Sequence, residues 1–413
     1  MELKGGGSMV IRENYLKQLD QWRDRQLIKV VTGVRRCDKS TLLEQYRALL
    51  LERGVAPEQI VSLNLEALEN ESLLDYHALY SYLCERLHPT LKTYIFLDEI
   101  QLVREFQKAV DSLYIKPNVD LYITGSNAYL LSGELATLLS GRYIEINLLP
   151  LSFAECCSMK GDPDDAALAS YLRTGGMPYL IQADLSSDEA ETYLEGIYNT
   201  IVVKDIELRQ SRQDKDPDRR RVTDLTLLKN IARFLANSIG SPVSVKSISD
   251  YLTSAGRKIS PNTVDDYLDA LVDPYVFYPV ERFDVTGKKL LKQNRKFYIV
   301  DLGLRRHLVS RRNYDLGFSL ENTVYFELLR RGYSVNVGKL GDAEIDFVAR
   351  KNERFAYFQV TASMADPATF ERELAPLRAV KDNYPKTVLT LDRLTPGDVD
   401  GIEIVNATDW LAQ

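Results

Sequence analysis

One stretch near the N-terminus constrains the fold most strongly. The apolar run "QLIKVV" ends at Thr32 and Gly33, and after a short loop "STLLEQYRALLLERG" repeats apolar residues at helical spacing up to Gly54. A buried strand, a glycine turn and a helix that stops at glycine are the expected structure. Such units build a parallel sheet that is covered by helices on both faces.

The loop of this unit, "GVRRCDKST", differs at one position from the phosphate-binding pattern G-x-x-x-x-G-K-[ST]. Gly33, Lys39 and Ser40 match, and Asp38 stands where the second glycine belongs. In that pattern the lysine reaches the β and γ phosphates and the hydroxyl binds Mg²⁺. The sequence therefore predicts an ATP and Mg²⁺ site, with Ser40 as a metal ligand. The nucleotide-binding candidates are Gly33, Arg35, Arg36, Cys37, Asp38, Lys39, Ser40 and Thr41.

Two motifs downstream add the chemistry of phosphoryl transfer. "YIFLDEIQ" ends an apolar strand in Asp98 and Glu99, and "ITGSN" ends the next strand near Asn127. We assign Asp98 to Mg²⁺, Glu99 to the general base, and Asn127 to orienting the attacking water. Taken alone, the carboxylate pair would favour a helix N-cap, but its position downstream of the phosphate-binding loop favours the metal site; Asn127 alone would suit a turn.

The rest of the chain divides by pattern. After the strand "RYIEINLL" the sequence becomes mostly helical, is broken at "RTGGMPYL", and leads into the charged linker "RQSRQDKDPDRRR". Three helical stretches and two strands around Gly287 then follow the order of a winged helix-turn-helix. A helix, a three-strand meander, a helix and a further strand complete the chain. The expected domains are an ATPase core at 9–158, a helical lid and linker at 159–221, a winged helix at 222–312 and a small α/β domain at 313–413.

Composition sets further bounds on the 413 residues. The net charge of −7 argues against a uniformly basic nucleic-acid coat, and the four cysteines lack paired C-x-x-C spacing. No zinc site or disulfide framework is expected. No apolar run reaches the roughly 18 residues of a membrane span, so we expect no membrane association and a cytoplasmic location. Residues 1–8, "MELKGGGS", are typical of an added Gly-rich leader and are excluded from fold reasoning.

Six motifs in order, "GVRRCDKSTLL", "IFLDEIQ", "ITGSN", "LSGRY", "LPLSFAE" and "GGMPYL", make the chain similar to prokaryotic AAA+-type ATPases that carry a C-terminal nuclease-like domain. The resemblance spans the chain from Met9. It implies an α/β fold with a P-loop parallel sheet, a helical lid, a winged helix and a restriction-endonuclease-like, PD-(D/E)xK-like domain. It also implies that Arg142 is an arginine finger, which would act on a neighbouring subunit and require a homo-oligomer.

Asp38 departs from the family pattern. Its Cβ stands where the backbone must approach the phosphate, and its charge lies near the β-phosphate. We expect Arg35 or Arg36 to offset part of that charge. The hypothesis is that this chain uses ATP weakly or not at all, either as a natural variant or through an introduced substitution.

The C-terminal domain departs from its pattern too. Nucleases of this type need an acidic ligand, and then a carboxylate and a lysine two residues apart on the next strand. Asp346 supplies the first, Glu321 is a further acidic candidate, and Gln359 and Thr361 stand where Glu and Lys belong. Threonine cannot replace the ammonium that stabilises a developing anion. The sequence therefore predicts a vestigial site with little or no nuclease activity.

The winged helix raises DNA as a partner. Its third helix is acidic, which disfavours major-groove binding, whereas basic residues on the hairpin are better placed for phosphates. The acidic set is Asp265, Asp266, Asp269 and Asp273, and the basic set is Lys288, Lys289, Lys292, Arg295 and Lys296.

Three functions follow from these features. The first is an ATP-hydrolysing enzyme coupled to its C-terminal domains and impaired by Asp38. The alternative is a non-hydrolysing pseudo-ATPase that binds DNA or a protein partner. The third, an ATP-gated nuclease, is disfavoured by Gln359 and Thr361.

Overall fold

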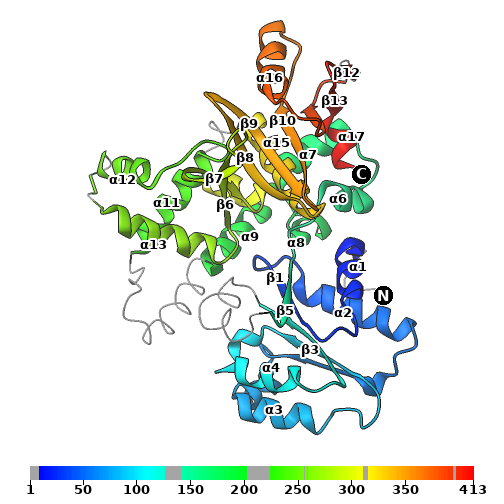
Figure 1. The fold of residues 1–413 in the computed structure, drawn as a ribbon. Coiled ribbons are helices and arrows are strands. Elements are labelled where there is room, and N and C mark those ends of the chain that lie inside the picture. The colour runs from blue at the N-terminus through cyan, green and yellow to red at the C-terminus, as the bar shows by residue number, and fades with distance from the viewer. Residues whose placement is uncertain are drawn as a thin grey trace. The chain divides into compact units, whose positions relative to one another are not determined.

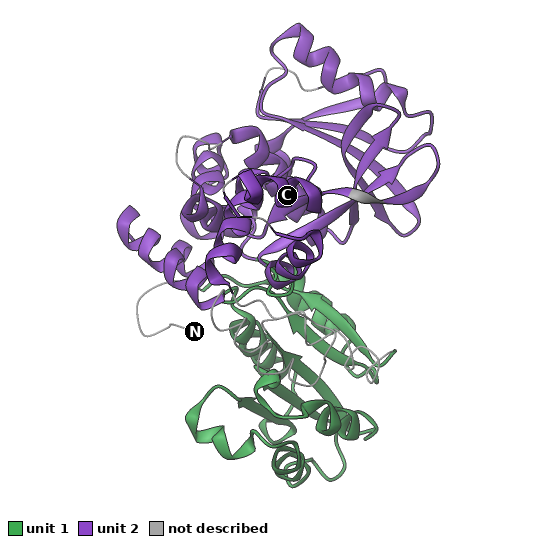
Figure 2. Cartoon of the chain, turned by 90° about the vertical axis from the view of Figure 1, so that its left-hand side faces the viewer, with its two compact units in different colours: residues 1–3, 9–149, 273–275 green, residues 4–8, 150–272, 276–413 purple. Residues whose placement is uncertain are grey.

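The computed structural model describes residues 9–125, 141–183, 185–201, 224–254, 256–257, 259–309, 315–393 and 397–413, without the side chains of residues 292 and 293. The chain forms two compact units (Figure 2). Unit 1 contains Met9–Leu149 and the short segment Asp273–Tyr275; unit 2 contains Pro150–Val272 and Val276–Gln413. The charged linker 209–221 lies outside the described residues.

Unit 1 is built on a five-stranded sheet in which every paired strand is parallel (Figure 1). Its order is β2-β3-β4-β1-β5. All residues of β1 and β3 are buried, as expected for apolar strands covered on both faces. The parallel α/β core expected from the sequence is confirmed. The strands are β1 (Ile28–Thr32), β2 (Ile60–Asn64), β3 (Thr93–Asp98), β4 (Val119–Thr124) and β5 (Tyr143–Asn147).

Helices and short 3-10 turns connect these strands. Leu79 and Leu83 of α3 and Val110 and Leu113 of α4 are fully buried in one apolar cluster with the sheet. This burial supplies most of the free energy that holds the helices in place. The elements are α1 (Glu13–Gln21), α2 (Lys39–Glu52), η1 (Pro57–Gln59), η2 (Leu68–Leu73), α3 (Tyr76–Cys84), η3 (Ile100–Leu102) and α4 (Phe106–Tyr114).

Unit 2 begins with short helices. Gly175 and Gly176 end α7 and Pro178 starts α8, so the predicted break at "RTGGMPYL" is confirmed. The helices are α6 (Phe153–Lys160), α7 (Asp165–Thr174), α8 (Pro178–Gln182) and α9 (Ser187–Thr200). A further short helix, α14 (Leu302–Leu308), lies later in the chain.

Three helices and a hairpin follow in the predicted order. They are α11 (Leu225–Asn237), α12 (Val245–Ser254), α13 (Pro261–Val272), β6 (Phe277–Asp284) and β7 (Lys289–Ile299). The hairpin is not a separate element, because β6 also pairs in parallel with β8 (Ser334–Leu340). It therefore extends the C-terminal sheet to eight strands, in the order β12-β13-β11-β10-β9-β8-β6-β7.

The remaining elements follow the predicted order of helix, meander, helix and strand. Helix α15 (Leu316–Arg330) precedes the antiparallel strands β8, β9 (Ala343–Lys351) and β10 (Arg354–Thr361). After α16 (Pro367–Ala379), β11 (Lys386–Thr390) lies parallel to β10. The last strands of the sheet are β12 (Gly397–Val399) and β13 (Ile402–Asn406), and helix α17 (Ala407–Leu411) follows them.

A buried carboxylate explains the first glycine of "RTGGMPYL". Asp301 caps α14 by accepting from the backbone N–H groups of Gly303 at 2.8 Å and Leu304 at 3.2 Å. Its other oxygen accepts from Gly176 N at 2.7 Å. A Cβ on Gly175, whose φ is +74°, would lie 2.4 Å from both Asp301 oxygens. Only glycine at this position leaves room for the carboxylate.

Asp301 should make stability depend on pH. Burial raises the pKa of this carboxyl to about 6, although the surrounding N–H groups lower it. The folded chain then holds a proton that the unfolded chain releases from about pH 4, so stability falls as pH rises through 6. A shift of about two units corresponds to about 3 kcal/mol. We expect Asp301→Asn to remove this part of the pH dependence of unfolding between pH 4 and 7.

Asp315 provides the matched control for that measurement. It caps α15 through Gly317 N and Phe318 N in the same way but is exposed. Asp315→Asn removes a helix cap of the same kind from an exposed position, and its unfolding is measured over the same pH range. An equal effect of both substitutions would contradict the assignment to Asp301.

Among the helices of the described residues, none combines the length and the apolar character that a membrane span requires.

Candidate functional site

The loop between β1 and α2 has the backbone of a phosphate-binding loop. Gly33 has φ of +143°, and a Cβ there would lie 2.2 Å from the carbonyl oxygen of Leu148. Arg36 and Asp38 also have positive φ, at +66° and +68°. The first glycine of the motif is therefore required by close packing, and the position of the second is left-handed.

Asp38 occupies that left-handed position as the N-cap of α2, with φ of +68° and ψ of +39°, and its side chain caps no backbone N–H. Asp and Asn tolerate this conformation better than other non-glycine residues. The backbone at Asp38 thus keeps a conformation that glycine would also adopt.

Burial raises the pKa of Asp38, and the positive charges of Arg12, Lys39 and Arg36 lower it in turn. Arg36 was one of the two residues expected to offset the carboxylate. Arg12 was not predicted: it lies before α1, is 2% exposed, and donates from its guanidinium to the carbonyl of Leu149 at 2.7 Å. No local sequence signal marks Arg12, because its contacts come from distant parts of the chain.

Lys39 points back into its own loop. It is 6% exposed, and Nζ donates to the carbonyl oxygens of Gly33 and Val34, both at 3.1 Å. A lysine that contacts a γ-phosphate would have to leave these two carbonyls. The other loop positions differ in exposure: Cys37 is fully buried, Arg35 and Thr41 are half-buried, and Arg36 and Ser40 are exposed.

The two predicted Mg²⁺ ligands meet at the carboxyl end of the sheet. Ser40 Oγ, at the start of α2, donates to Asp98 Oδ2 at 2.6 Å. Thr124, at the end of β4, donates to the other oxygen of Asp98 and is fully buried. A hydroxyl and a carboxylate at this spacing suit a metal that is also bound by phosphate oxygens.

Glu99 directly follows this carboxylate. It adopts φ of +54°, and its N–H donates to Thr124 Oγ1 at 2.9 Å. Gln101 Nε2 donates to Glu99 Oε2. Thr124 therefore positions both acidic residues, although no role was expected for it. The sequence did contain a signal: Thr124 ends an apolar strand, as Asp98 does, and parallel strands end at the same edge of a sheet. Asn127, the predicted water-orienting residue, lies outside the described residues.

Arg142 lies away from the phosphate loop of its own chain. Its carbonyl accepts from Ile28 N at 2.8 Å, at the start of β1, whereas Gly33 follows the end of β1. Ile28 and Gly33 are five residues apart, which is about 16 Å along the strand at 3.3 Å per residue. The guanidinium pairs with Asp111 of α4 and lies 5.5 Å from the ring centre of Tyr114. Contact with a γ-phosphate would thus require another subunit.

The segment Asp273–Tyr275 contributes a further side chain to unit 1. Tyr275 donates to Glu145 Oε1 at 3.0 Å, and Thr32 Oγ1 donates to the same oxygen at 2.6 Å. Thr32 is the residue just before Gly33. Sequence reasoning missed Tyr275, because it is separated from Glu145 by 130 positions.

In the C-terminal sheet, three of the four predicted vestigial nuclease residues come together. Glu321 of α15 and Asp346 of β9 both lie near Lys296 Nζ, at 3.1 Å and 4.0 Å. Gln359 Oε1 accepts from Asp346 N at 3.3 Å. Thr361 instead donates to the carbonyl of Ser363 at 3.1 Å, outside this group. Among the described residues, no group of three or more His, Cys, Asp or Glu side chains is arranged to hold a metal ion.

The assignment of Lys296 to an exposed wing was wrong. Lys296 is 3% exposed, because Glu321 of α15 and Glu344 of β9 lie against its ammonium at 3.1 Å and 2.8 Å. Lys288, Lys289 and Arg295 are exposed, and the side chain of Lys292 is not described. Among the acidic residues, Asp265 and Asp269 of α13 are exposed, and Asp266 and Asp273 are half-buried.

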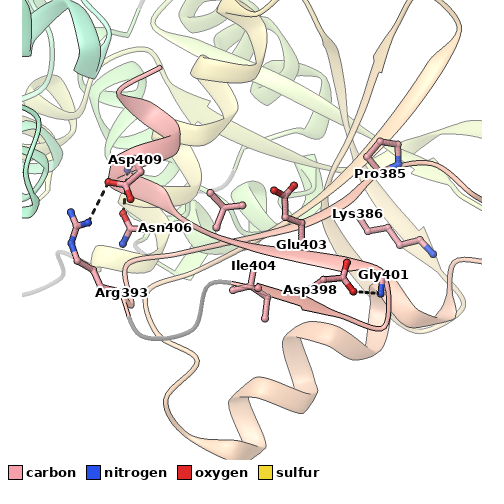
Figure 3. Close-up of a pocket in the computed structure, with 11 residues that line it drawn as sticks. Pro385, Lys386, Arg393, Asp398, Gly401, Glu403, Ile404, Asn406 and Asp409 are labelled. Atoms are coloured by element: carbon pink, nitrogen blue, oxygen red, sulfur yellow. Dashed lines mark hydrogen bonds and ion pairs between the residues drawn. The ribbon is translucent and has the colours of Figure 1, made fainter.

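A cavity of about 770 Å³ lies along β13 (Figure 3). Its rim carries both signs of charge, from Lys386 and Arg393 and from Asp398, Glu403 and Asp409. Asp409 and Arg393 pair at 3.3 Å. None of the predicted site residues lines it, and the mixed charge gives no preference for an anion such as a nucleotide.

Comparison with known proteins adds to this geometry. A family model described as an AAA domain matches residues 25–157, and one described as "Domain of unknown function (DUF8612)" matches residues 165–315. An "Uncharacterized protein" of Haemophilus influenzae is 42% identical over 412 residues, covering 98% of this chain and 99% of that protein. The chain belongs to the same family as this protein. "Uncharacterized protein MJ1544" of Methanocaldococcus jannaschii is 28% identical, covering 93% of this chain and 88% of its own length.

Two solved structures are similar at lower identity. The Walker-type ATPase PABY2304 of Pyrococcus abyssi is 16% identical with a TM-score of 0.46, covering 73% of this chain and 96% of that chain. The ORC1 protein of Aeropyrum pernix in complex with DNA is 15% identical with a TM-score of 0.30, covering 73% and 93%. The match of residues 25–157 to the AAA domain identifies an AAA-type P-loop ATPase fold in unit 1, which implies nucleotide use, usually with Mg²⁺.

Proposed function

We propose that this chain is an ATPase that binds Mg-ATP at the loop from Gly33 to Thr41 and hydrolyses it to ADP and phosphate, with nucleotide use impaired by Asp38. The observation that carries the proposal is the 2.6 Å hydrogen bond between Ser40 Oγ and Asp98 Oδ2. It joins the loop after β1 to the end of β3, where a Mg²⁺ ion bound to phosphates needs its protein ligands.

Each residue then has a role. Lys39 would exchange the carbonyls of Gly33 and Val34 for phosphate oxygens, and Ser40 and Asp98 would hold Mg²⁺. Glu99 would take the proton of the attacking water, and Asn127 would orient that water. Arg142 would stabilise the transferring phosphoryl group of a neighbouring subunit, so the active form is a homo-oligomer. Mg²⁺ would supply charge neutralisation on the phosphates.

The C-terminal half supports a binding role. We assign residues 222–312 to a winged helix and residues 313–413 to a nuclease-like domain without nuclease activity, which would engage DNA or a protein partner. The helices and hairpin from α11 to β7 and the run from α15 to β11 support these assignments by their order. The displacement of Thr361 from the acidic group supports the lack of activity.

Steady-state phosphate release tests the proposal. Glu99→Gln should lower the rate about 100-fold, as expected when a general base is lost, and leave ATP affinity unchanged. Glu105→Gln is the matched control, since Glu105 is also a left-handed helix N-cap residue, with φ of +54°. Both rates should be measured in the Asp38→Gly chain, where nucleotide binding is expected to be stronger.

The pseudo-ATPase alternative is favoured by one observation: Lys39 donates to the carbonyl oxygens of Gly33 and Val34 in its own loop. It predicts a chain that binds DNA or a protein partner and does not hydrolyse ATP. Equal phosphate release by the Glu99→Gln chain and its parent would therefore reject the enzymatic proposal in favour of this alternative.

A further inference from the structure

A buried ammonium lies at the centre of a group of carboxylates in the C-terminal sheet. Nζ of Lys296 is 2.8 Å from Glu344 Oε1, 3.1 Å from Glu321 Oε1 and 4.0 Å from Asp346 Oδ1. The lysine comes from β7, one glutamate from α15, and the other two acids from β9. We call Lys296, Glu321, Glu344 and Asp346 the ammonium cluster.

The lysine reaches β9 because the sheet curls. Strands β8 and β6 lie between β9 and β7 in the sheet order, yet the rings of Tyr298 and Phe347 are only 5.7 Å apart between centres. Helix α15 closes the concave side, where Asn322 exchanges two hydrogen bonds of 2.9 Å with the backbone of Ile299. The cluster is therefore a product of tertiary packing.

The inner part of the cluster is enclosed, whereas the side chain of Glu344 is 30% exposed. The turn at Gly240, with φ of +70°, is so close that a Cβ there would lie 3.0 Å from Glu321 Oε2. Tyr298 donates to Glu321 Oε1 at 2.6 Å. Lys296 and Glu321 are 3% and 9% exposed in their side chains, and Asp346 is 13% exposed. A large substrate such as a DNA backbone has no direct approach to these oxygens.

The acidic side chains of the cluster need a positive charge among them. Three acidic side chains around one point favour a cation, because isolated buried charges are costly. Arg282 is 3.5 Å from Glu344 Oε2 and relieves only the outer acid. Burial and the neighbouring Glu321 raise the pKa of Asp346 well above its usual range, while Lys296 lowers it. The ammonium is thus the cation that holds the inner acids together.

We propose that the ammonium of Lys296 takes the position of a divalent metal ion in this cluster, so that the chain binds no metal there and a chain without the ammonium binds one. A hard divalent cation would take carboxylate oxygens at 2.0 to 2.6 Å, whereas an ammonium holds them at hydrogen-bonding distance. The lysine is attached to the fold, so the site keeps its cation at any metal concentration. This inference goes beyond the proposed ATPase function and does not depend on it.

The proposal is tested by titrating Mn²⁺ into the full chain. The electron paramagnetic resonance signal of free Mn²⁺ measures how much of the ion is bound. Lys296→Ala and Lys296→Gln should each gain one Mn²⁺ site that the parent chain lacks. Adding Asp346→Asn should remove the gained site. Lys289→Ala is the matched control: this lysine lies on the same hairpin but is exposed, and its loss should gain nothing.

Two results of the Mn²⁺ titration would overturn the proposal. A Mn²⁺ site in the parent chain that disappears with Asp346→Asn overturns it, and so does a folded Lys296 variant that gains no site. If both Lys296 variants are unfolded without metal, the readout is far-ultraviolet circular dichroism during the Mn²⁺ titration. Recovery of the parent spectrum supports the proposal, and failure of both variants to recover overturns it.

Discussion

Replacing Asp38 with glycine is expected to raise the affinity for Mg-ATP by about 100-fold to 1,000-fold. Two unit charges 4 Å apart interact by about 4 kcal/mol at an effective dielectric constant of 20, and every 1.4 kcal/mol is tenfold in affinity. Arg12, Lys39 and Arg36 already act on the carboxylate, so part of the repulsion is offset. Isothermal titration of Mg-ATP into both chains measures the difference.

A second substitution, Asp38→Asn, separates charge from shape in that experiment. It keeps a side chain that tolerates the left-handed backbone but removes the charge. If repulsion is the cause, Asp38→Asn should recover most of the gain seen with glycine. If only glycine raises the affinity, the Cβ is the cause. Equal affinities of all three chains would reject the hypothesis that Asp38 impairs nucleotide use.

Loss of Arg142 should lower phosphate release about 1,000-fold in the Asp38→Gly chain, which is the lower end of the range for an arginine finger. Its ion pair with Asp111 does not oppose this role, because both side chains are substantially exposed, at 40% and 43%. Exposed pairs contribute about 1 kcal/mol or less. The guanidinium can therefore exchange Asp111 for a phosphate of a neighbouring subunit at little cost in free energy.

Mixing two inactive chains tests whether Arg142 acts between subunits. Arg142→Ala retains Glu99, and Glu99→Gln retains Arg142, so mixed oligomers contain sites with both groups. We expect the mixture to release phosphate faster than the sum of the two chains alone. Asp111→Ala is the control, since it removes the ion pair but keeps the guanidinium, and should retain activity. A mixture that never exceeds the sum would contradict action between subunits.

Much of the fold was predictable because its signals are local. The buried runs before Gly33 and before Asp98 identified β1 and β3, and the break at Gly175 and Gly176 was correctly placed. The candidate metal pair was also predictable, because parallel strands end at the same edge of a sheet and bring Ser40 and Asp98 together.

The residues that sequence reasoning missed share one property. Arg12, Thr124, Tyr275 and Asp301 act on partners far away in the sequence, through contacts that depend on how the strands and turns pack. Lys296 was assigned wrongly for the same reason. A hairpin with several lysines is typical of an exposed wing, and only the packing of α15 and β9 against β7 buries this lysine.

The sequence by itself determined the parallel α/β core, the loop that starts at Gly33, and the change at Asp38, because hydrophobic period and loop residues are properties of short segments. Tertiary structure alone decided three things. It brought the positive charges of Arg12 and Arg36 close enough to act on Asp38. It placed Arg142 at the opposite end of β1 from the phosphate loop. It also buried Lys296 among acidic side chains. Charges act through space, so their effect depends on distances that only the folded chain sets.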